Sequence, residues 1–276
     1  MSSINLTGPM LFFGGPYSNL EALRALRDVA DMRGIAADHC LCSGDVVAYC
    51  ADAQACVDEI CDWGVHVVMG NCEESLGQGQ EDCGCGFEEG TACDVLSKQW
   101  FTYANAQLTE DARAWMRNLP RSITVRYTPF KMLAVHGGVE EINKFIFESQ
   151  KAEIAQELEK ADVDVVLAGH CGLPFSKKVG DQYWINAGVI GMPANDGQPH
   201  TWYCVITPDE NGLEVGFYPL SYDYQTTQFK MATKGLATGY RDALATGLWP
   251  SLDVLPQVEK MKTDQGLSLK RFNINP

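Results

Sequence analysis

Four polar residues, each beside a glycine, follow apolar segments of this chain, and this pattern constrains the fold more than any other feature of the sequence. The residues and the segments before them are Asp45 after 40–42, Asn71 after 65–69, His136 after 131–135 and His170 after 163–168. These segments have the length of buried strands, and glycine permits a sharp turn where each strand ends. Because the carboxyl ends of parallel strands meet at one edge of a sheet, we expect the four side chains to lie together.

Apolar periodicity predicts alternating strands and helices at the start of the chain. Strands are predicted at residues 10–13, 40–42 and 65–69, with amphipathic helices at 19–33 and 52–63 between them. Ser18 or Asn19 can cap the first of these helices. The β-α-β-α-β order predicts parallel pairing with right-handed crossovers.

The remainder of the chain predicts a second sheet and further helices. Helices are expected at 93–103, 109–118, 149–161, 224–233 and 238–245, and additional strands at 123–127, 131–135, 163–168, 178–179, 183–186, 202–207 and 213–219. Residues 75–92 are rich in Gly, Glu and Asp without a hydrophobic period, so we expect a loop insertion there. We predict a single domain over residues 1–276, with a helical extension at about 222–276 that ends in an irregular tail.

Charge and hydropathy limit the partners and the location of the protein. The formal net charge of −15 repels phosphate backbones and no run of Lys or Arg opposes it, so duplex nucleic acid is not an expected partner. No apolar run approaches the ~18 residues that cross a bilayer, which argues against a membrane. Residues 1–9 carry no Lys or Arg ahead of a hydrophobic segment, so we expect no secretory signal and a cytoplasmic location.

The 11 cysteines are an odd number in a chain without an export signal, which favours reduced thiols or metal ligands over a disulfide framework. Cys83, Cys85 and Cys93 could bind a structural zinc ion or an iron-sulfur cluster, although their spacing matches no paired CxxC rule. Other cysteines on strand or helix faces are expected to fill the core, and these are Cys40, Cys42, Cys56 and Cys61.

The four strand-end residues combine two imidazoles with two oxygen donors. This combination suits zinc, iron or manganese and leaves room for water at an open coordination position. Any one of Asp45, Asn71, His136 and His170 could instead be a satisfied structural polar group. The prediction of a metal site rests on their occurrence as an ordered set.

The motifs taken jointly resemble those of the calcineurin-like metallophosphoesterases, near the diadenosine tetraphosphatase-like phosphatases and the small bacterial phosphodiesterases. The resemblance covers about residues 10–222, and its motifs are Asn19-Leu20-Glu21-Ala22-Leu23, Gly44-Asp45-Val46-Val47-Ala48-Tyr49, Gly70-Asn71, His136-Gly137, Gly169-His170, Pro174-Phe175 and Asn186-Ala187-Gly188. It implies an α/β fold of two packed mixed β-sheets flanked by helices, a four-layer α-β-β-α sandwich. It also implies a two-metal centre at the strand ends.

Three positions depart from the family pattern. Gly15 and Tyr17 stand where the family has Asp-x-His, and Gly172 stands where it has the second histidine of Gly-His-x-His. These changes delete most ligands of one metal, whereas the other site keeps its full family set of Asp45, Asn71, His136 and His170. The resemblance therefore implies one divalent transition metal (Zn, Fe or Mn) and not two.

The candidate catalytic residues are Cys72, Tyr17 and His136. Cys72 replaces a histidine that in this family faces the substrate phosphate, and its thiol could act as an acid, ligate the metal as a thiolate or merely fill space. Gly15 and Tyr17 mark either a rebuilt anion site at the first helix or the remains of a lost metal site. Further candidates for contacts around the centre or with an anion are Gly15, Asn19, Glu73, Cys171 and Asn186.

The function expected from this set is hydrolysis of a phosphoric ester, as a phosphatase or phosphodiesterase, at an altered, single-metal centre acting on a small phosphorylated substrate. The alternative is a catalytically inactive member of the same fold that binds a phosphate-type ligand or a protein. A third reading is a thiol-based redox or metal sensor that uses Cys72 with the Cys83 loop. The sequence leaves the oligomeric state open, with a homo-oligomer as one option.

Overall fold

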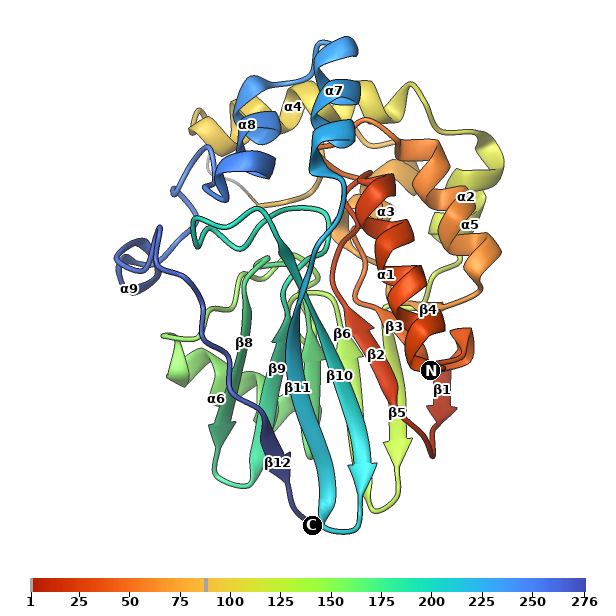
Figure 1. Cartoon of the computed structure of the whole chain (residues 1–276), viewed down its shortest axis with the longest axis vertical. Coiled ribbons are helices and arrows are strands. Elements are labelled where there is room, and N and C mark those ends of the chain that lie inside the picture. Colours follow the sequence, from red (N-terminus) through yellow and green to blue (C-terminus); the bar gives the residue numbers. More distant parts are fainter. Residues whose placement is uncertain (1, 87–88) are drawn as a thin grey trace.

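The computed structural model describes residues 2–86 and 89–276, and its centre is a pair of packed six-stranded mixed sheets (Figure 1). In spatial order, the strands of the first sheet are β1 (Ser2–Asn5), β5 (Ser122–Tyr127), β6 (Phe130–Val135), β7 (Val165–Ala168), β9 (Gln182–Ala187) and β8 (Pro174–Val179). Those of the second are β12 (Phe272–Ile274), β11 (Gly212–Leu220), β10 (Thr201–Asp209), β2 (Met10–Phe13), β3 (Cys40–Cys42) and β4 (His66–Val67).

Helices cover both outer faces of this pair of sheets. The helices of the described chain are α1 (Leu20–Arg33), the short 3-10 helix η1 (Ala37–His39), α2 (Ala53–Trp63), α3 (Asn71–Gln78), α4 (Ala92–Asn105), α5 (Glu110–Arg117), α6 (Lys151–Ala161), α7 (Tyr224–Thr233), α8 (Thr238–Thr246) and α9 (Gln257–Lys260). Asn19 caps α1, because its Oδ1 accepts a hydrogen bond from the N–H of Ala22 at 3.2 Å. The predicted four-layer α-β-β-α sandwich is confirmed.

The core consists of three apolar layers, and short strands contribute to two of them at once. Met10 and Phe12 of β2 pack between the two sheets, whereas Leu11 and Phe13 pack against α1 and α2. Successive side chains of a strand point to opposite faces, so a strand buried on both faces is apolar throughout. This explains the unbroken apolar run of β2. The third layer lies between the first sheet and α6.

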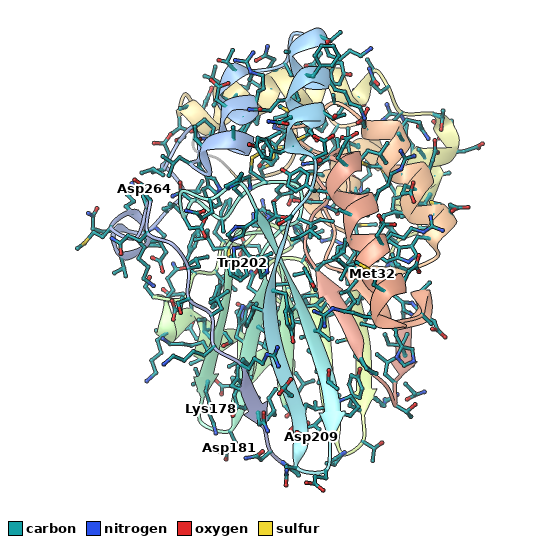
Figure 2. All side chains as sticks on the ribbon, in the orientation of Figure 1. Met32, Lys178, Asp181, Trp202, Asp209 and Asp264 are labelled. Atoms are coloured by element: carbon teal, nitrogen blue, oxygen red, sulfur yellow. A yellow bond between two sulfur atoms is a disulfide. The ribbon has the colours of Figure 1, made fainter. Side chains whose placement is uncertain are left out.

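Parallel pairing brings the carboxyl ends of the site-bearing strands to one end of the sandwich. β2 pairs with β3 and β3 with β4 in parallel, and in the other sheet β6 pairs in parallel with β7. Helices α4, α7 and α8 gather at this end (Figure 1). The hairpin turns near Lys178, Asp181 and Asp209 lie at the opposite end (Figure 2).

Two predicted boundaries near the third strand are wrong. The strand expected at 65–69 is only His66–Val67, because the N–H of Met69 leaves the sheet and donates to the carbonyl of Pro120 at 2.8 Å. Residues 71–78 then form α3, so the loop expected from residue 75 begins at residue 79. The glycine and acidic residues of this segment do not predict a helix, because the stability of this helix comes from tertiary contacts. The helix expected from residue 149 begins at Lys151.

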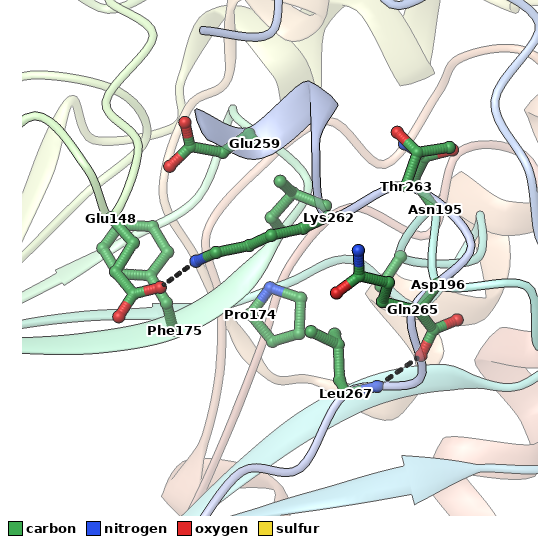
Figure 3. Close-up of a pocket in the computed structure, with 12 residues that line it drawn as sticks. Glu148, Pro174, Phe175, Asn195, Asp196, Glu259, Lys262, Thr263, Gln265 and Leu267 are labelled. Carbon is green, nitrogen blue, oxygen red and sulfur yellow. Dashed lines mark hydrogen bonds and ion pairs between the residues drawn. The ribbon is translucent and has the colours of Figure 1, made fainter. Parts of the chain in front are cut away.

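The C-terminal tail is more regular than its sequence predicts. It contains α9 and also β12, which pairs antiparallel with β11. The ammonium group of Lys262 lies 2.8 Å from a carboxylate oxygen of Glu148, and the N–H of Leu267 lies 3.5 Å from a carboxylate oxygen of Asp196 (Figure 3). These contacts hold the tail along the sandwich and enclose a small cavity of about 50 Å³.

Candidate metal centre

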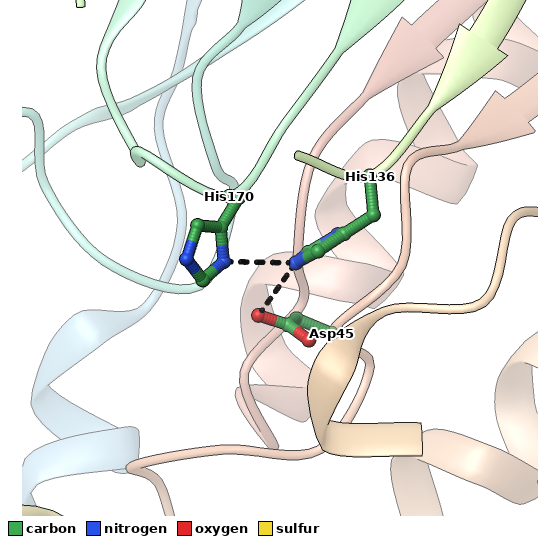
Figure 4. Close-up of side chains that lie close together, drawn as sticks. All are labelled: Asp45, His136 and His170. Carbon is green, nitrogen blue, oxygen red and sulfur yellow. Dashed lines mark hydrogen bonds and ion pairs between the residues drawn. The ribbon is translucent and has the colours of Figure 1, made fainter. Parts of the chain in front are cut away.

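The loops after β3, β6 and β7 and the start of α3 bring four polar side chains to one buried point. Nε2 of His136 lies 3.3 Å from Oδ2 of Asp45, 3.0 Å from Oδ1 of Asn71 and 3.1 Å from Nδ1 of His170. Figure 4 shows the two imidazoles and the carboxylate facing one another. All four residues are at least nine-tenths buried.

The surrounding backbone determines which atoms of these side chains face the centre. Nδ1 of His136 lies 2.6 Å from the carbonyl oxygen of Ser43, and because a carbonyl only accepts, Nδ1 carries the hydrogen. The amide nitrogen of Asn71 donates to the carbonyl of Cys83 at 2.9 Å, so its oxygen is turned towards His136. In the neutral imidazole, Nε2 therefore presents a lone pair to the oxygens of Asp45 and Asn71.

The two oxygens that face Nε2 of His136 can be satisfied by a protonated imidazole or by a bound cation. Burial lowers the pKa of His136, but the carboxylate of Asp45 outweighs this effect and the net pKa is raised. Burial, and then the neighbouring His136, lower the pKa of His170 to about 3, so its imidazole is neutral. Neutral imidazole and carboxylate are ligand types for a divalent transition metal, and the residues present therefore fit such an ion.

Two of the four residues adopt the left-handed backbone region. The φ angles of Asp45 and of His170 are both +57°. This conformation is uncommon for residues other than glycine, and it is tolerated where the surrounding structure enforces it, often at functional sites. The turn geometry directs both side chains inward from the strand ends.

Glu73 anchors the loop that carries Asp45. One carboxylate oxygen accepts from the N–H of Asp45 at 2.7 Å and of Gly70 at 2.9 Å, and the other accepts from the N–H of Val46 at 2.8 Å. Burial and then the charge of Asp45 raise the pKa of Glu73 to about 7. Gly70 leaves room for this arrangement, because a Cβ there would lie 2.3 Å from Oδ1 of Asp45.

Asn186 and Cys171 support the loop that carries His170. The amide nitrogen of Asn186 donates to the carbonyl of Gly169 at 2.6 Å and contacts the sulfur of Cys171 at 3.2 Å. Its oxygen accepts from the N–H of Gly188 at 3.0 Å. Asn186 thus connects the end of β9 to the turn that presents His170.

Cys72 lies beside the centre but outside the group of converging ligand atoms. Its N–H donates to Oδ1 of Asp45 at 3.1 Å, and only 1% of the residue is exposed. Burial, followed by the charges of Asp45 and Glu73, raises the pKa of the thiol well above its usual value. The side chains whose ligand atoms converge are Asp45, His136 and His170, and Cys72 is not among them.

The ring of Tyr17 occupies the space that a side chain at position 15 would need. A Cβ at Gly15 would lie 2.5 Å from Cε1 of Tyr17 and 2.7 Å from the carbonyl oxygen of Asp45. The small residue and the large one are therefore complementary. Asn19, the other residue considered for an anion site, uses its side chain to cap α1, to bond the carbonyl of Gly191 and to accept from Thr227.

We predict that Gly15→Asp does not create a second metal site. Because the added Cβ meets both a ring and a backbone carbonyl, we expect the variant to lose about 2 kcal/mol of unfolding free energy through overpacking, with no gain of metal. Chemical denaturation and elemental analysis measure the two effects. Gly266→Asp is the matched control, since a Cβ at Gly266 meets no atom within 4 Å. Two metal equivalents in a stable Gly15→Asp protein would contradict the prediction.

The cysteine expectations are partly wrong. Cys83 and Cys85 form a disulfide, contrary to the prediction that the thiols are reduced. Cys93 instead lines a pocket with Tyr240, so the structure does not support the predicted three-cysteine cluster. Cys61, expected in the core, is exposed, whereas Cys40, Cys42 and Cys56 are buried. Position on a helix face is settled by what packs there, and a thiol tolerates either environment.

Sequence reasoning missed the backbone carbonyls that orient the centre and the aromatic residues beside it. Carbonyl oxygens such as those of Ser43 and Cys83 have no signature in a sequence. Tyr240 and Trp249, in the C-terminal extension, line a pocket together with His170. The signal in the sequence that could have indicated this pocket is the presence of aromatic residues in the C-terminal extension, outside the family motifs.

The four-layer sandwich and the donor set at its strand ends define the class of the protein as a metallophosphoesterase-type α/β fold with a candidate metal site of Asp45, His136 and His170. The model of the calcineurin-like phosphoesterase superfamily domain matches residues 18–211. The chain belongs to this superfamily, as its motifs predict.

Individual relatives are distant. An uncharacterised protein of Methanocaldococcus jannaschii is 25% identical over 248 residues, which cover 84% of this chain and 95% of that protein. A metallophosphoesterase of Sphaerobacter thermophilus has a similar structure, with a TM-score of 0.68 and 22% identity over 88% of this chain and 100% of that one. A hypothetical protein of Pyrococcus horikoshii OT3 has a TM-score of 0.73 and 16% identity over 89% and 100%. These two structures support the fold.

Within the described part of the chain, no helix has both the length and the apolar character needed to span a membrane.

Proposed function

We propose that the protein is a metal-dependent phosphoric ester hydrolase whose single metal is held by Asp45, Asn71, His136 and His170. The observation that carries the proposal is the convergence of atoms able to ligate a metal around Nε2 of His136, while its Nδ1–H donates to Ser43. When bound there, a divalent cation would activate a water nucleophile and polarise a phosphoryl oxygen.

The surroundings of the centre support the proposal of a single metal. Among the described residues, the His, Cys, Asp and Glu side chains whose ligand atoms lie within 4.8 Å of one another form one group of three, Asp45, His136 and His170. Tyr17 and Gly15 interlock where the family places ligands of the other metal. These observations support the proposal that the centre holds one ion.

Tyr17 is the better candidate for the residue that assists the leaving group. Burial, and then the charge of Asp45, raise the pKa of its phenol well above the usual value, so the hydroxyl group remains protonated and can donate. The pKa of the Cys72 thiol is raised as well, by burial and then by the charge of Asp45. The two residues differ in access: Tyr17 lines a pocket together with His170, whereas Cys72 is only 1% exposed. His136 acts as a ligand, with its ring orientation held by Ser43.

The proposed substrate is a small phosphorylated molecule, and the proposed location is the cytoplasm. A net charge of −15 without a basic cluster in the sequence disfavours extended phosphate backbones. A small phosphate ester interacts mainly with the charges at the centre, where a bound metal would supply positive charge.

We predict that the purified protein binds about one equivalent of a divalent transition metal and hydrolyses bis(4-nitrophenyl) phosphate only in the metal-loaded form. Elemental analysis gives the stoichiometry, and release of 4-nitrophenolate gives the rate before and after chelation. Turnover should disappear on chelation and return when metal is added. Full turnover in the metal-free protein would refute the proposal, and bound metal without turnover would favour the non-catalytic alternative.

A further inference from the structure

A cavity of about 70 Å³ lies beside His170, on the side of the centre where the family places its other metal. Its walls combine the loops after β2 and β3 with the C-terminal extension, and its aromatic lining residues are Tyr17, Tyr49, Phe145, Tyr240 and Trp249. The extension thus forms part of the wall of the candidate active site.

Ring contacts hold these walls in place. The ring centroids of Tyr17 and Tyr49 are 4.8 Å apart in an edge contact, and those of Tyr49 and Tyr240 are 4.4 Å apart. The indole N–H of Trp249 donates to the carbonyl of Pro193 at 2.7 Å. A Cβ at Gly172 would lie 3.3 Å from the Trp249 ring, so the indole packs where the family carries a histidine side chain.

The part of the cavity wall that the structure describes is apolar apart from hydroxyl, thiol and imidazole groups. No Lys, Arg, Asp or Glu is among the described residues that line it. The hydroxyl groups of Tyr17 and Tyr240 make no hydrogen bond to the described residues, although both tyrosines are more than nine-tenths buried. A phenolic hydroxyl group can donate a hydrogen bond, so this wall suits a ligand with acceptor oxygens.

We propose that this cavity binds the apolar substituent of a monoanionic phosphoryl group, so that the substrate is a phosphodiester with one small, uncharged apolar alcohol group rather than a phosphomonoester dianion. This inference rests on the proposed function. The phosphoryl group would lie at Asp45, Asn71, His136 and His170, with the tyrosine hydroxyl groups facing its oxygens. Hydrolysis adds the oxygen of water to phosphorus, breaks one ester P–O bond and leaves the proton on the released alcohol.

The size of the cavity limits the substituent. An apolar cavity of about 150 Å³ accommodates benzene, so about 70 Å³ suits a short alkyl chain or the edge of a ring. Trp249 and Tyr240 would act as specificity-determining residues, because they close the cavity without belonging to the metal ligands. A charged substituent would lose its hydration without gaining a partner.

The test measures binding of non-hydrolysable monoanions to the metal-loaded protein by calorimetry. Methyl propylphosphonate should bind about tenfold more tightly than methyl methylphosphonate, since each buried CH₂ strengthens binding about fourfold and ordering the chain reduces the gain. Methyl 2-carboxyethylphosphonate should bind more weakly than the propyl compound. In Trp249→Ala the propyl preference should fall to about twofold with unchanged metal content, and Trp249→Phe should retain most of it.

Phe229→Ala is the control, because Phe229 lies on α7 of the same extension and is 73% exposed. It should keep both the propyl preference and the metal. Turnover adds a second readout: methyl 4-nitrophenyl phosphate should have a higher kcat/KM than the dianion 4-nitrophenyl phosphate.

The outcomes separate the two proposals. Equal binding of the methyl and propyl compounds, or an unchanged propyl preference in a folded Trp249→Ala protein, overturns the cavity assignment even if the protein hydrolyses diesters. A propyl preference that depends on Trp249 without any turnover refutes the proposed hydrolase and keeps the cavity as a ligand site.

Discussion

His170→Ala is expected to remove the metal and the hydrolysis together. His170 contributes one of the atoms that face Nε2 of His136, and its imidazole is held neutral, ready to ligate. Loss of a contact that only supports a ligand typically costs 10- to 100-fold in metal affinity, so loss of the ligand itself should lower turnover by more than about 100-fold. Elemental analysis and diester hydrolysis at saturating substrate measure the two effects.

The control for this variant is His66→Ala. His66 lies on β4, is half-buried and contacts the carbonyl of Asp38 at 3.2 Å. The substitution therefore removes an imidazole that has no contact with the centre. Its metal content and turnover should equal those of the wild type. A His170→Ala protein that keeps metal and rate would mean that the acceptor cluster around His136 is a purely structural hydrogen-bond network.

Glu73→Ala is expected to produce the largest loss of stability of any single change around the centre. The substitution removes the acceptor of three backbone N–H groups at 2.7 to 2.9 Å, all in a region closed to water. Each buried donor left without a partner costs about 1 kcal/mol or more, so the unfolding free energy should fall by about 3 kcal/mol. Urea denaturation of metal-free protein measures this change.

The same variant should also bind metal about 10- to 100-fold more weakly, because the loop that carries Asp45 loses its anchor. Glu74→Ala is the matched control: Glu74 is the next residue and forms an ion pair with the partly exposed Arg121, a contact worth at most about 1 kcal/mol. Equal stability losses in the two variants would show that the carboxylate of Glu73 does not hold the loop.

Much of the fold follows from local patterns. Strands such as β2 and helices such as α1 and α2 were predicted within a residue of their bounds, because apolar periodicity and capping residues act over a few positions. The errors include β1, which was not predicted, and β8, which begins at Pro174 and not at residue 178. They also include β4, α3 and the C-terminal tail. There, hydrogen bonds to distant residues, such as that from Met69 to Pro120, decide where an element ends.

The candidate site divides in the same way. Local sequence patterns predict which residue types stand at the strand ends and, through the order of their motifs, the superfamily of the chain. Long-range packing, which no local pattern reveals, places Ser43 to orient His136, Cys83 to orient Asn71 and Tyr17 beside Gly15. The same long-range packing places Trp249 over Gly172, which is 77 positions away in the sequence. These contacts join segments that are remote in sequence, and no local preference for helix, strand or turn specifies which distant side chain will fill a given space.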